Sequence, residues 1–288
     1  MTVDAGPPPS PPAAIAQEDA PQRRVLMRQR GAFDDVVVVE EDGLVLLRFG
    51  SPDGADQSAV DPRAPDRVIF EYVRIAAAAP ALRPDGRPFR SALMLGLGGG
   101  AWPRLIMGHH PRAVIDAVDV DPLVIEAAKR FFFVEEGPRL RLHADDAARY
   151  VERPEVRERR YDVIFVDAFS GEAMPPSLST PTFFQALKRI LTDDGVLAVN
   201  VALVSDSDAQ AIITRISDAF PGCSWARARQ EENQLVFAGK RPIGATAVRS
   251  ALIKAGIDVN LDIVRDVSDV VACPTPAPTS TAGQKLFE

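Results

Sequence analysis

Short apolar runs alternate with amphipathic stretches from Arg90 onward, and this alternation predicts the fold. The apolar runs are too short for helices and predict buried parallel strands, while the stretches between them have helical spacing. The predicted strands are 92–98, 114–120, 140–144, 161–167, 195–201, 223–229 and 234–239, and the predicted helices include 122–132, 181–191 and 206–220. The last two strands are joined by a turn too short for a helix, so they must pair as a hairpin. The pattern predicts an α/β fold with a Rossmann-like, methyltransferase-type sheet that ends in an antiparallel hairpin.

A different pattern precedes this region. Two β-rich runs, 36–39 and 44–47, flank Asp42-Gly43, a pair typical of hairpin turns. They predict a small N-terminal antiparallel β unit, followed by a loop over 50–61 and a helix over 66–79. We therefore expect four segments, which are a disordered Pro-rich tail at 1–22, a β-hairpin unit at 23–65, a nucleoside-binding Rossmann-like domain at 66–272 and a disordered tail at 273–288.

A glycine-rich turn follows the first strand of the main sheet. Gly96, Gly98, Gly99 and Gly100 lie there without side chains, so the backbone can approach a ligand closely. About twenty residues later, Asp119 and Asp121 follow the next strand, where a ribose hydroxyl pair would lie. The two features together predict a nucleoside site. By itself, the glycine spacing suits an NAD-binding turn equally well.

Further acids at the strand ends help to decide between an adenosine site and an NAD-binding turn. Asp145 and Asp146 follow the third strand, where a carboxylate accepts a hydrogen bond from the adenine amine or caps the next helix. Asp167 ends the fourth strand and points toward the crevice at the carboxyl edge of the sheet. Acids at neighbouring strand tips suit an adenosine that carries a cationic centre better than they suit a pyrophosphate.

Composition excludes several other classes. The net charge of −7 argues against nucleic acid as a partner, and no apolar run approaches the ~18 residues of a membrane span. The N-terminus lacks the pattern of a secretory signal. Two cysteines argue against a disulfide framework and a cysteine-built zinc site, and the three histidines show no metal-binding spacing. We therefore expect a cytoplasmic protein with no metal, no membrane contact and no nucleic-acid partner.

From about residue 25 to about residue 201, the chain resembles the spermidine synthases (polyamine aminopropyltransferases), as a divergent member on the class I SAM-dependent methyltransferase fold. The matching motifs include Val118-Asp-Val-Asp121, Ala144-Asp-Asp146 and Thr182-Phe-Phe-x-x-Leu-Lys-Arg-x-Leu. The resemblance implies that Asp119 binds the ribose of S-adenosylmethionine or its decarboxylated form, that Asp145 reads the adenine and that Asp167 is catalytic. It also implies a lid over 168–178 and a homodimer.

Three departures from the family pattern bear on the acceptor. Gly99 stands where family enzymes carry an aspartate that holds the aminopropyl amine, Ser170 replaces a second aspartate, and Phe70 replaces a tyrosine. Each change removes a polar group that would hold a diamine, so putrescine is disfavoured and intact S-adenosylmethionine becomes more acceptable. We predict that Gln57, Phe70 and Ser170 contact the substrate.

Three functions remain open from the sequence. The first is transfer of an aminopropyl or related alkyl group to a small-molecule amine. The second is methylation of a small molecule on the same scaffold. The third is a non-catalytic, nucleoside-binding homologue. The sequence identifies neither the acceptor nor which form of the donor is used.

Overall fold

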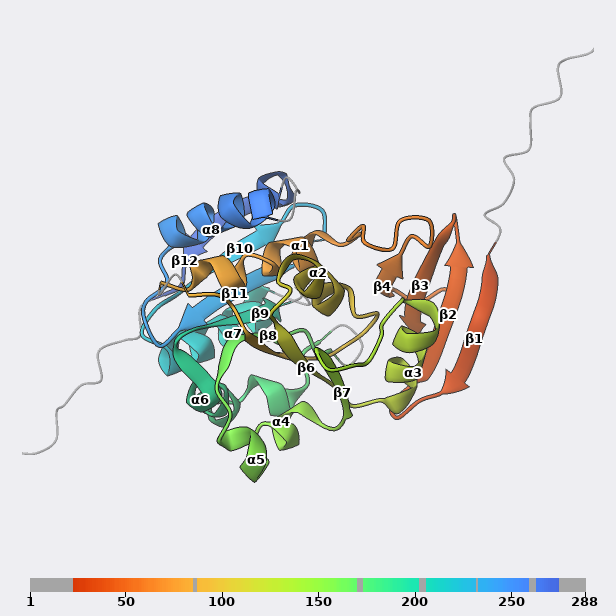
Figure 1. Cartoon of the computed structure of the whole chain (residues 1–288), viewed down its shortest axis with the longest axis horizontal. Coiled ribbons are helices and arrows are strands. Elements are labelled where there is room, and N and C mark those ends of the chain that lie inside the picture. The colour runs from red at the N-terminus through yellow and green to blue at the C-terminus, as the bar shows by residue number, and fades with distance from the viewer. Residues whose placement is uncertain are drawn as a thin grey trace, which may run out of the picture.

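The computed structural model describes residues 23–84, 87–169, 173–201, 206–231, 233–258 and 263–274. The predicted tail 1–22, the predicted tail from residue 275 onward and Ser170 lie outside these ranges. Two sheets organise the described chain, a small N-terminal one and a larger central one (Figure 1).

The N-terminal sheet has four antiparallel strands in the order β1-β2-β3-β4. They are β1 (Arg24–Arg30), β2 (Asp35–Glu41), β3 (Leu44–Phe49) and β4 (Asp56–Val60). Asp42 and Gly43 turn the chain between β2 and β3 with φ of 51° and 79°, as a two-residue hairpin requires. The predicted β unit is confirmed. The predicted loop 50–61 is wrong at its end, because Gln57 lies on β4, whose residues pair with β3 and partly face the core.

The central sheet has eight strands in the order β12-β10-β11-β9-β8-β5-β6-β7. They are β5 (Ser91–Leu95), β6 (Val114–Asp119), β7 (Leu140–Ala144), β8 (Tyr161–Val166), β9 (Leu191–Val201), β10 (Cys223–Ala228), β11 (Gln234–Gly239) and β12 (Val267–Ala272). The strands from β7 to β9 pair in parallel, and β11 pairs antiparallel with both β9 and β10. This arrangement confirms the predicted Rossmann-like sheet with its terminal hairpin. The edge strand β12, which the sequence did not predict, pairs antiparallel with β10.

Helices cover both faces of the central sheet (Figure 1). On one face lie α1 (Glu71–Ala76), η1 (Ala79–Leu82), α2 (Ala101–His109), α8 (Ala245–Asp258) and η3 (Ile263–Asp266). On the other lie α4 (Ala147–Tyr150), α5 (Pro154–Arg157), η2 (Pro176–Ser179), α6 (Pro181–Ile190) and α7 (Asp206–Ala219). Helix α3 (Pro122–Phe131) packs toward the N-terminal sheet, where Val124 and Ala127 join a core cluster with Val36 and Val38. No helix in these ranges is long and apolar enough to cross a membrane.

The predicted helix over 66–79 is shorter than expected. The chain is extended before Glu71 because the Arg74 guanidinium donates to the carbonyl oxygens of Val68 and Ile69, at 2.8 and 2.7 Å. Glu231, from the β10–β11 turn, accepts hydrogen bonds from the first backbone N–H groups of α1. Helical spacing could not show this boundary, since residue 231 sets it from a distant part of the chain.

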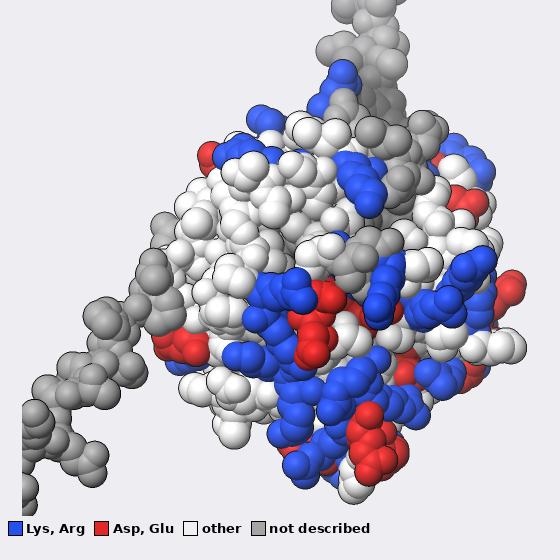
Figure 2. Space-filling model, turned by 60° about the vertical axis from the view of Figure 1, so that its left-hand side comes forward, with Lys and Arg blue, Asp and Glu red and all other residues white. Residues whose placement is uncertain are grey.

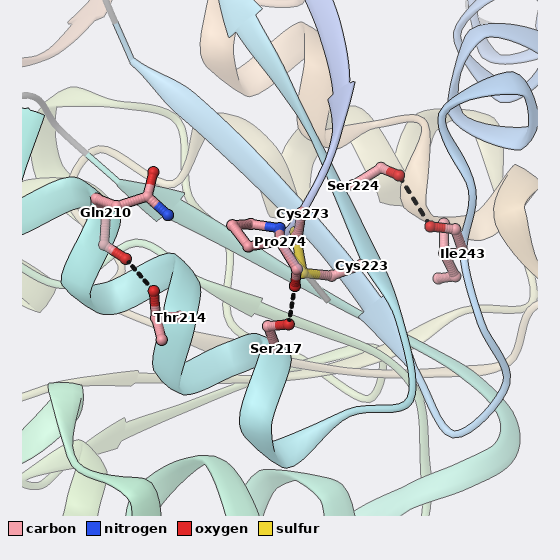
Figure 3. The surroundings of a disulfide bond; sticks show 8 residues. All are labelled: Gln210, Thr214, Ser217, Cys223, Ser224, Ile243, Cys273 and Pro274. Carbon is pink, nitrogen blue, oxygen red and sulfur yellow. Dashed lines mark hydrogen bonds between the residues drawn. A yellow bond between two sulfur atoms is a disulfide. The ribbon is translucent and has the colours of Figure 1, made fainter. Parts of the chain in front are cut away.

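The two cysteines argued against a disulfide framework, but the structure contains one disulfide. Cys223, at the start of β10, is bonded to Cys273, which follows β12, with their Cα atoms 5.3 Å apart (Figure 3). Antiparallel pairing of β10 with β12 brings the two residues together, and that pairing could not be foreseen without β12. Next to the disulfide, the Ser217 hydroxyl of α7 donates to the Pro274 carbonyl oxygen at 2.5 Å. The first two residues of the predicted tail 273–288 are therefore held against the fold.

Acidic and basic side chains lie close together on the surface. Figure 2 shows Lys and Arg side chains gathered in the lower part of one face, with Asp and Glu side chains among them. Beneath the surface, the buried carboxylate of Asp116 on β6 pairs with the guanidinium groups of Arg141 and Arg159, both at 2.8 Å. Burial opposes ionisation of this group, but hydrogen bonds from His143 and Tyr161 and the two arginines hold the pKa of Asp116 below its usual value.

Candidate functional site

A cavity of about 1150 Å³ lies where the carboxyl ends of the parallel strands meet the N-terminal sheet. It brings together most of the residues predicted from the sequence, namely Gln57, Phe70, Gly96, Gly98, Asp119, Asp121, Asp145, Asp146 and Asp167. Gly99 and Gly100 do not line it, and Ser170 lies outside the described residues. Carboxylates from the ends of β6, β7 and β8 thus reach one space, as the strand order requires.

The glycine-rich turn forms one wall of the cavity. Gly96 and Gly98 have φ of 92° and 51°, which favours glycine at both positions. A Cβ on Gly96 would lie 2.1 Å from the Asp167 carbonyl oxygen, so this glycine also lets the turn pack against the end of β8. The Asp119 carboxylate accepts from Leu97 N at 2.9 Å and holds the turn in place. Burial raises the pKa of Asp119, and these backbone hydrogen bonds oppose that effect.

The other two glycines shape the turn from outside the cavity. Gly100, with φ of 66°, is the residue that precedes α2. Gly99 N donates to the Ser58 hydroxyl of β4 at 2.7 Å. The turn is therefore tied to the N-terminal sheet at the position where the family pattern has an aspartate.

Two of the predicted acids act as helix caps. Asp121 accepts from Leu123 N at the start of α3 and, through its other oxygen, from Ala32 N of the β1–β2 loop at 2.7 Å. Asp146 caps α4 by accepting from Arg149 N. Both carboxylates still border the cavity.

Asp145 has a different set of partners. One of its oxygens accepts from Asp146 N at 2.9 Å, and the other lies 2.6 Å from an Arg153 guanidinium nitrogen. The sequence left open whether Asp145 caps the next helix or binds adenine. In the structure the cap is Asp146, and Asp145 lies at the end of β7 on the cavity wall.

Asp167 lies at the centre of a hydrogen-bonded group. Its carboxylate accepts from the Asn200 side-chain amide at 2.8 Å and from the Tyr72 hydroxyl. Burial raises the pKa of Asp167 to about 6, while the Asn200 and Tyr72 hydrogen bonds lower it and the charge of Glu231 adds to the rise. The group is therefore ionised at neutral pH and gains a proton only slightly below it.

Four residues of this group were missed from the sequence, namely Tyr72, Asn200, Glu231 and Asn233, all of which line the cavity. Asn200 left a usable signal, because it is a polar residue near the end of the otherwise apolar run 196–201. Glu231 and Asn233 left none, since they reach the site only when the β10–β11 hairpin folds beside β9.

The predicted substrate residues Gln57 and Phe70 lie on the wall formed by the N-terminal sheet and the segment that follows it. The Phe70 ring stacks on Tyr72, with centroids 5.8 Å apart and planes 20° apart. The side-chain amide of Gln57 donates to the Ala55 carbonyl oxygen at 3.4 Å.

The strand order and the acids at one sheet edge define a class, the Rossmann-like proteins with the methyltransferase fold. Residues 87–228 match the Spermine/spermidine synthase domain. The polyamine aminopropyltransferase of Chromobacterium violaceum is 33% identical over 184 residues, which cover 64% of this chain and 67% of that protein. That of Vibrio vulnificus is 37% identical over 134 residues, or 46% of this chain and 44% of the relative. The chain belongs to the spermidine synthase (polyamine aminopropyltransferase) family.

Methyltransferases are similar as well. The eEF1A lysine and N-terminal methyltransferase of Bos taurus is 31% identical over 153 residues, or 50% of this chain and 22% of that protein. The chain thus spans less than half of its Vibrio relative and about a fifth of its bovine one. All of these relatives are transferases.

Solved structures show the same fold. A probable spermidine synthase from Corynebacterium glutamicum superposes with a TM-score of 0.66 at 18% identity, covering 80% of this chain and 86% of that one. Human methyltransferase-like protein 13, solved in complex with SAH, gives a TM-score of 0.56 at 25% identity, covering 66% and 90% of the two chains.

Proposed function

We propose that this protein transfers an alkyl group, with aminopropyl as the leading candidate, from an S-adenosylmethionine-type sulfonium to the nitrogen of a small-molecule amine. The observation that carries the proposal is the position of the Asp167 carboxylate. It opens on the same cavity as the glycine turn, Asp119 and Asp145, with its own orientation held by Tyr72 and Asn200.

The donor side of the cavity is formed by the turn and the two strand-end acids. The backbone at Gly96 and Gly98 presents no side chain, and the remaining lone pairs of the Asp119 carboxylate suit ribose hydroxyls. Asp145 lines the same cavity, and we propose that its carboxylate accepts from an adenine amine. The donor, in its intact or decarboxylated form, supplies a carbon bonded to a positively charged sulfur.

Asp167 would serve the acceptor amine. A free amine with a pKa of ~10 arrives protonated and must lose a proton before its lone pair reacts. A nitrogen–carbon bond then forms as the carbon–sulfur bond breaks, and the bonding pair leaves on sulfur as a neutral thioether. Asp167, ionised above about pH 6, takes the proton or passes it to solvent and stabilises the cationic nitrogen.

Methyl transfer is a second candidate, and Gly99 favours it. No acid stands at this position to hold the ammonium group of a decarboxylated donor, and a Cβ there would meet Phe132 and Ser58 at 2.7 and 2.8 Å. Without an aspartate at position 99, no negative charge there repels the carboxylate of intact S-adenosylmethionine. The solved complex of human methyltransferase-like protein 13 with SAH, at 25% identity, supports a donor of this kind.

The nucleoside product distinguishes these functions without knowledge of the acceptor. The full chain is incubated with intact or decarboxylated S-adenosylmethionine and a panel of amines, and the nucleosides are separated by chromatography. Aminopropyl transfer from the decarboxylated donor releases methylthioadenosine, whereas methyl transfer from the intact donor releases S-adenosylhomocysteine. Parallel calorimetry measures binding of both donors. Tight binding with neither product would favour a non-catalytic homologue, and failure of both donors to bind would end the proposal.

The family also leads us to propose a homodimer. Sedimentation velocity on the full chain would test it, and a monomer at micromolar concentration would contradict it.

A further inference from the structure

The buried amide of Asn200 connects the Asp167 carboxylate to the β10–β11 turn. Asn200 is 2% exposed and lies on β9, near the edge of the sheet that borders the cavity. Its side-chain nitrogen donates to Asp167 at 2.8 Å, and its side-chain oxygen accepts from the Asn233 amide at 2.9 Å. Both ends of the amide are thus paired, as a buried polar group requires.

The two partners of the Asn200 amide, Asp167 and Asn233, together set the direction of these bonds. A side-chain amide presents donors on one side and an acceptor on the other, and its neighbours decide which way it faces. The Asn233 NH₂ group donates to the Asn200 oxygen, and the ionised Asp167 carboxylate, which can only accept, takes the Asn200 nitrogen, so both partners select the same orientation. In the reverse orientation two donor groups would face each other, and an amide oxygen would face a carboxylate oxygen.

We propose that Asn233 is a positioning residue for Asp167, because it holds the Asn200 amide in the orientation that donates to the carboxylate. The turn that carries Asn233 is itself anchored. The backbone oxygen of Asn233 accepts from Ala228 N at 2.8 Å, and Glu231 in the same turn caps α1. The catalytic consequence of this arrangement rests on the proposed function, but the arrangement itself does not.

Three groups act on the charge of Asp167. Tyr72 of α1 and Asn200 of β9 donate to the carboxylate and favour its ionised form, while the carboxylate of Glu231 opposes ionisation. Loss of Asn233 would remove one of the two partners that hold the Asn200 amide in place, which would weaken one of the two favourable contributions. Asp167 would then hold its proton to a higher pH.

The proposal is tested by titrating Asp167 directly. The full chain is labelled with ¹³C at aspartate carboxyls, and the Asp167 signal, assigned by its absence in Asp167→Asn, is followed by NMR from pH 4 to pH 9. We expect Asn233→Ala to move the midpoint to higher pH, in the direction given by Asn200→Ala. Asn233→Asp should move it further, because an ionised carboxylate would draw the Asn200 nitrogen away. Asn233→Gln, which keeps the donor, should restore much of the wild-type midpoint.

A matched control separates this effect from a general disturbance of the turn. Gln230 is an exposed residue of the same turn, so Gln230→Ala should leave the midpoint unchanged. Circular dichroism identifies any variant that does not fold, and the inference is then judged on the remaining ones. A midpoint that Asn200→Ala moves but that folded Asn233→Ala and Asn233→Asp leave unchanged would overturn the inference.

Activity provides an independent readout. If the proposed function holds, the acidic limb of the kcat/KM profile should move to higher pH in Asn233→Ala, with a loss of ~3-fold or more near pH 6 that recovers at alkaline pH. An NMR shift in a protein with no transferase activity would leave this inference standing and remove the proposed function. Transferase activity in a protein whose Asp167 midpoint does not move in the Asn233 variants would leave the proposed function standing and remove this inference.

Discussion

The Ser58 hydroxyl on β4 accepts a hydrogen bond from the backbone N–H of Gly99, at 2.7 Å. This bond joins the N-terminal sheet to the glycine turn of the candidate donor site. Ser58 and the Phe132 ring also occupy the space into which a side chain at position 99 would extend. The missing aspartate is therefore a feature of the packing between the two sheets.

Restoring that aspartate should destabilise the protein. A Cβ at position 99 would lie 2.7 Å from Phe132 and 2.8 Å from Ser58, so we expect Gly99→Ala to lower the free energy of unfolding by about 1–3 kcal/mol, and Gly99→Asp by at least as much. Urea denaturation measures the change. Gly108→Ala is the matched control, because a Cβ there meets nothing within 4 Å and the residue lies in α2. Equal stability of Gly99→Ala and wild type would show that the space is not filled.

Asp121 should contribute more to stability than to ligand binding. Its two oxygens cap α3 and hold Ala32 of the β1–β2 loop, so Asp121→Ala should cost about 1–2 kcal/mol. Asp119→Ala serves as the comparison, because that carboxylate is half-buried against the turn and faces the cavity. Calorimetric titration with S-adenosylmethionine should show the larger loss of affinity in Asp119→Ala. The opposite order would assign the ribose to Asp121.

Asp167→Asn should separate binding from turnover. The substitution keeps the shape of the side chain but removes the proton acceptor, so we expect turnover to fall by ~10²-fold or more with donor affinity little changed. In the wild type, the rate should decline as the pH falls through about 6, where the carboxylate gains its proton. Steady-state kinetics across pH, with calorimetry of each protein, checks both. An unchanged rate in the variant would remove Asp167 from the mechanism.

Asp167 should also make stability depend on pH. Its pKa is about 6 in the folded chain and ~3.9 in an unfolded one, so between these values the folded state binds more protons. The contribution of Asp167 to the free energy of unfolding is therefore fully present at low pH and is lost as the pH rises from about 4 to about 6. The difference in unfolding free energy between wild type and Asp167→Asn should fall over that range and stay constant above it. A difference that rises or stays flat would show that burial does not raise this pKa.

Local patterns were enough to predict seven of the eight strands of the central sheet and the acids at its edge. Asp119, Asp145 and Asp167 follow directly from where apolar runs end, because parallel strands present their carboxyl ends at one edge. What surrounds Asp167 was not predictable in this way. Asn233 approaches from another part of the chain, and its role appears only after the β10–β11 hairpin is placed beside β9. The start of α1 escaped prediction for the same reason, since its cap is Glu231.

The disulfide should stabilise the far edge of the central sheet. Cys223 and Cys273 are 50 residues apart, and closing a loop of that length restricts the unfolded chain by about 4 kcal/mol in the chain-entropy treatment. We expect Cys273→Ser to have a lower Tm than the oxidised wild type, because β12 then depends on its hydrogen bonds and packing alone. Dithiothreitol should lower the Tm of the wild type toward that of the variant and leave the variant unchanged. Titration of thiols in the unfolded, unreduced wild type should find none free; two free thiols, together with a Tm that does not respond to reductant, would contradict the assignment.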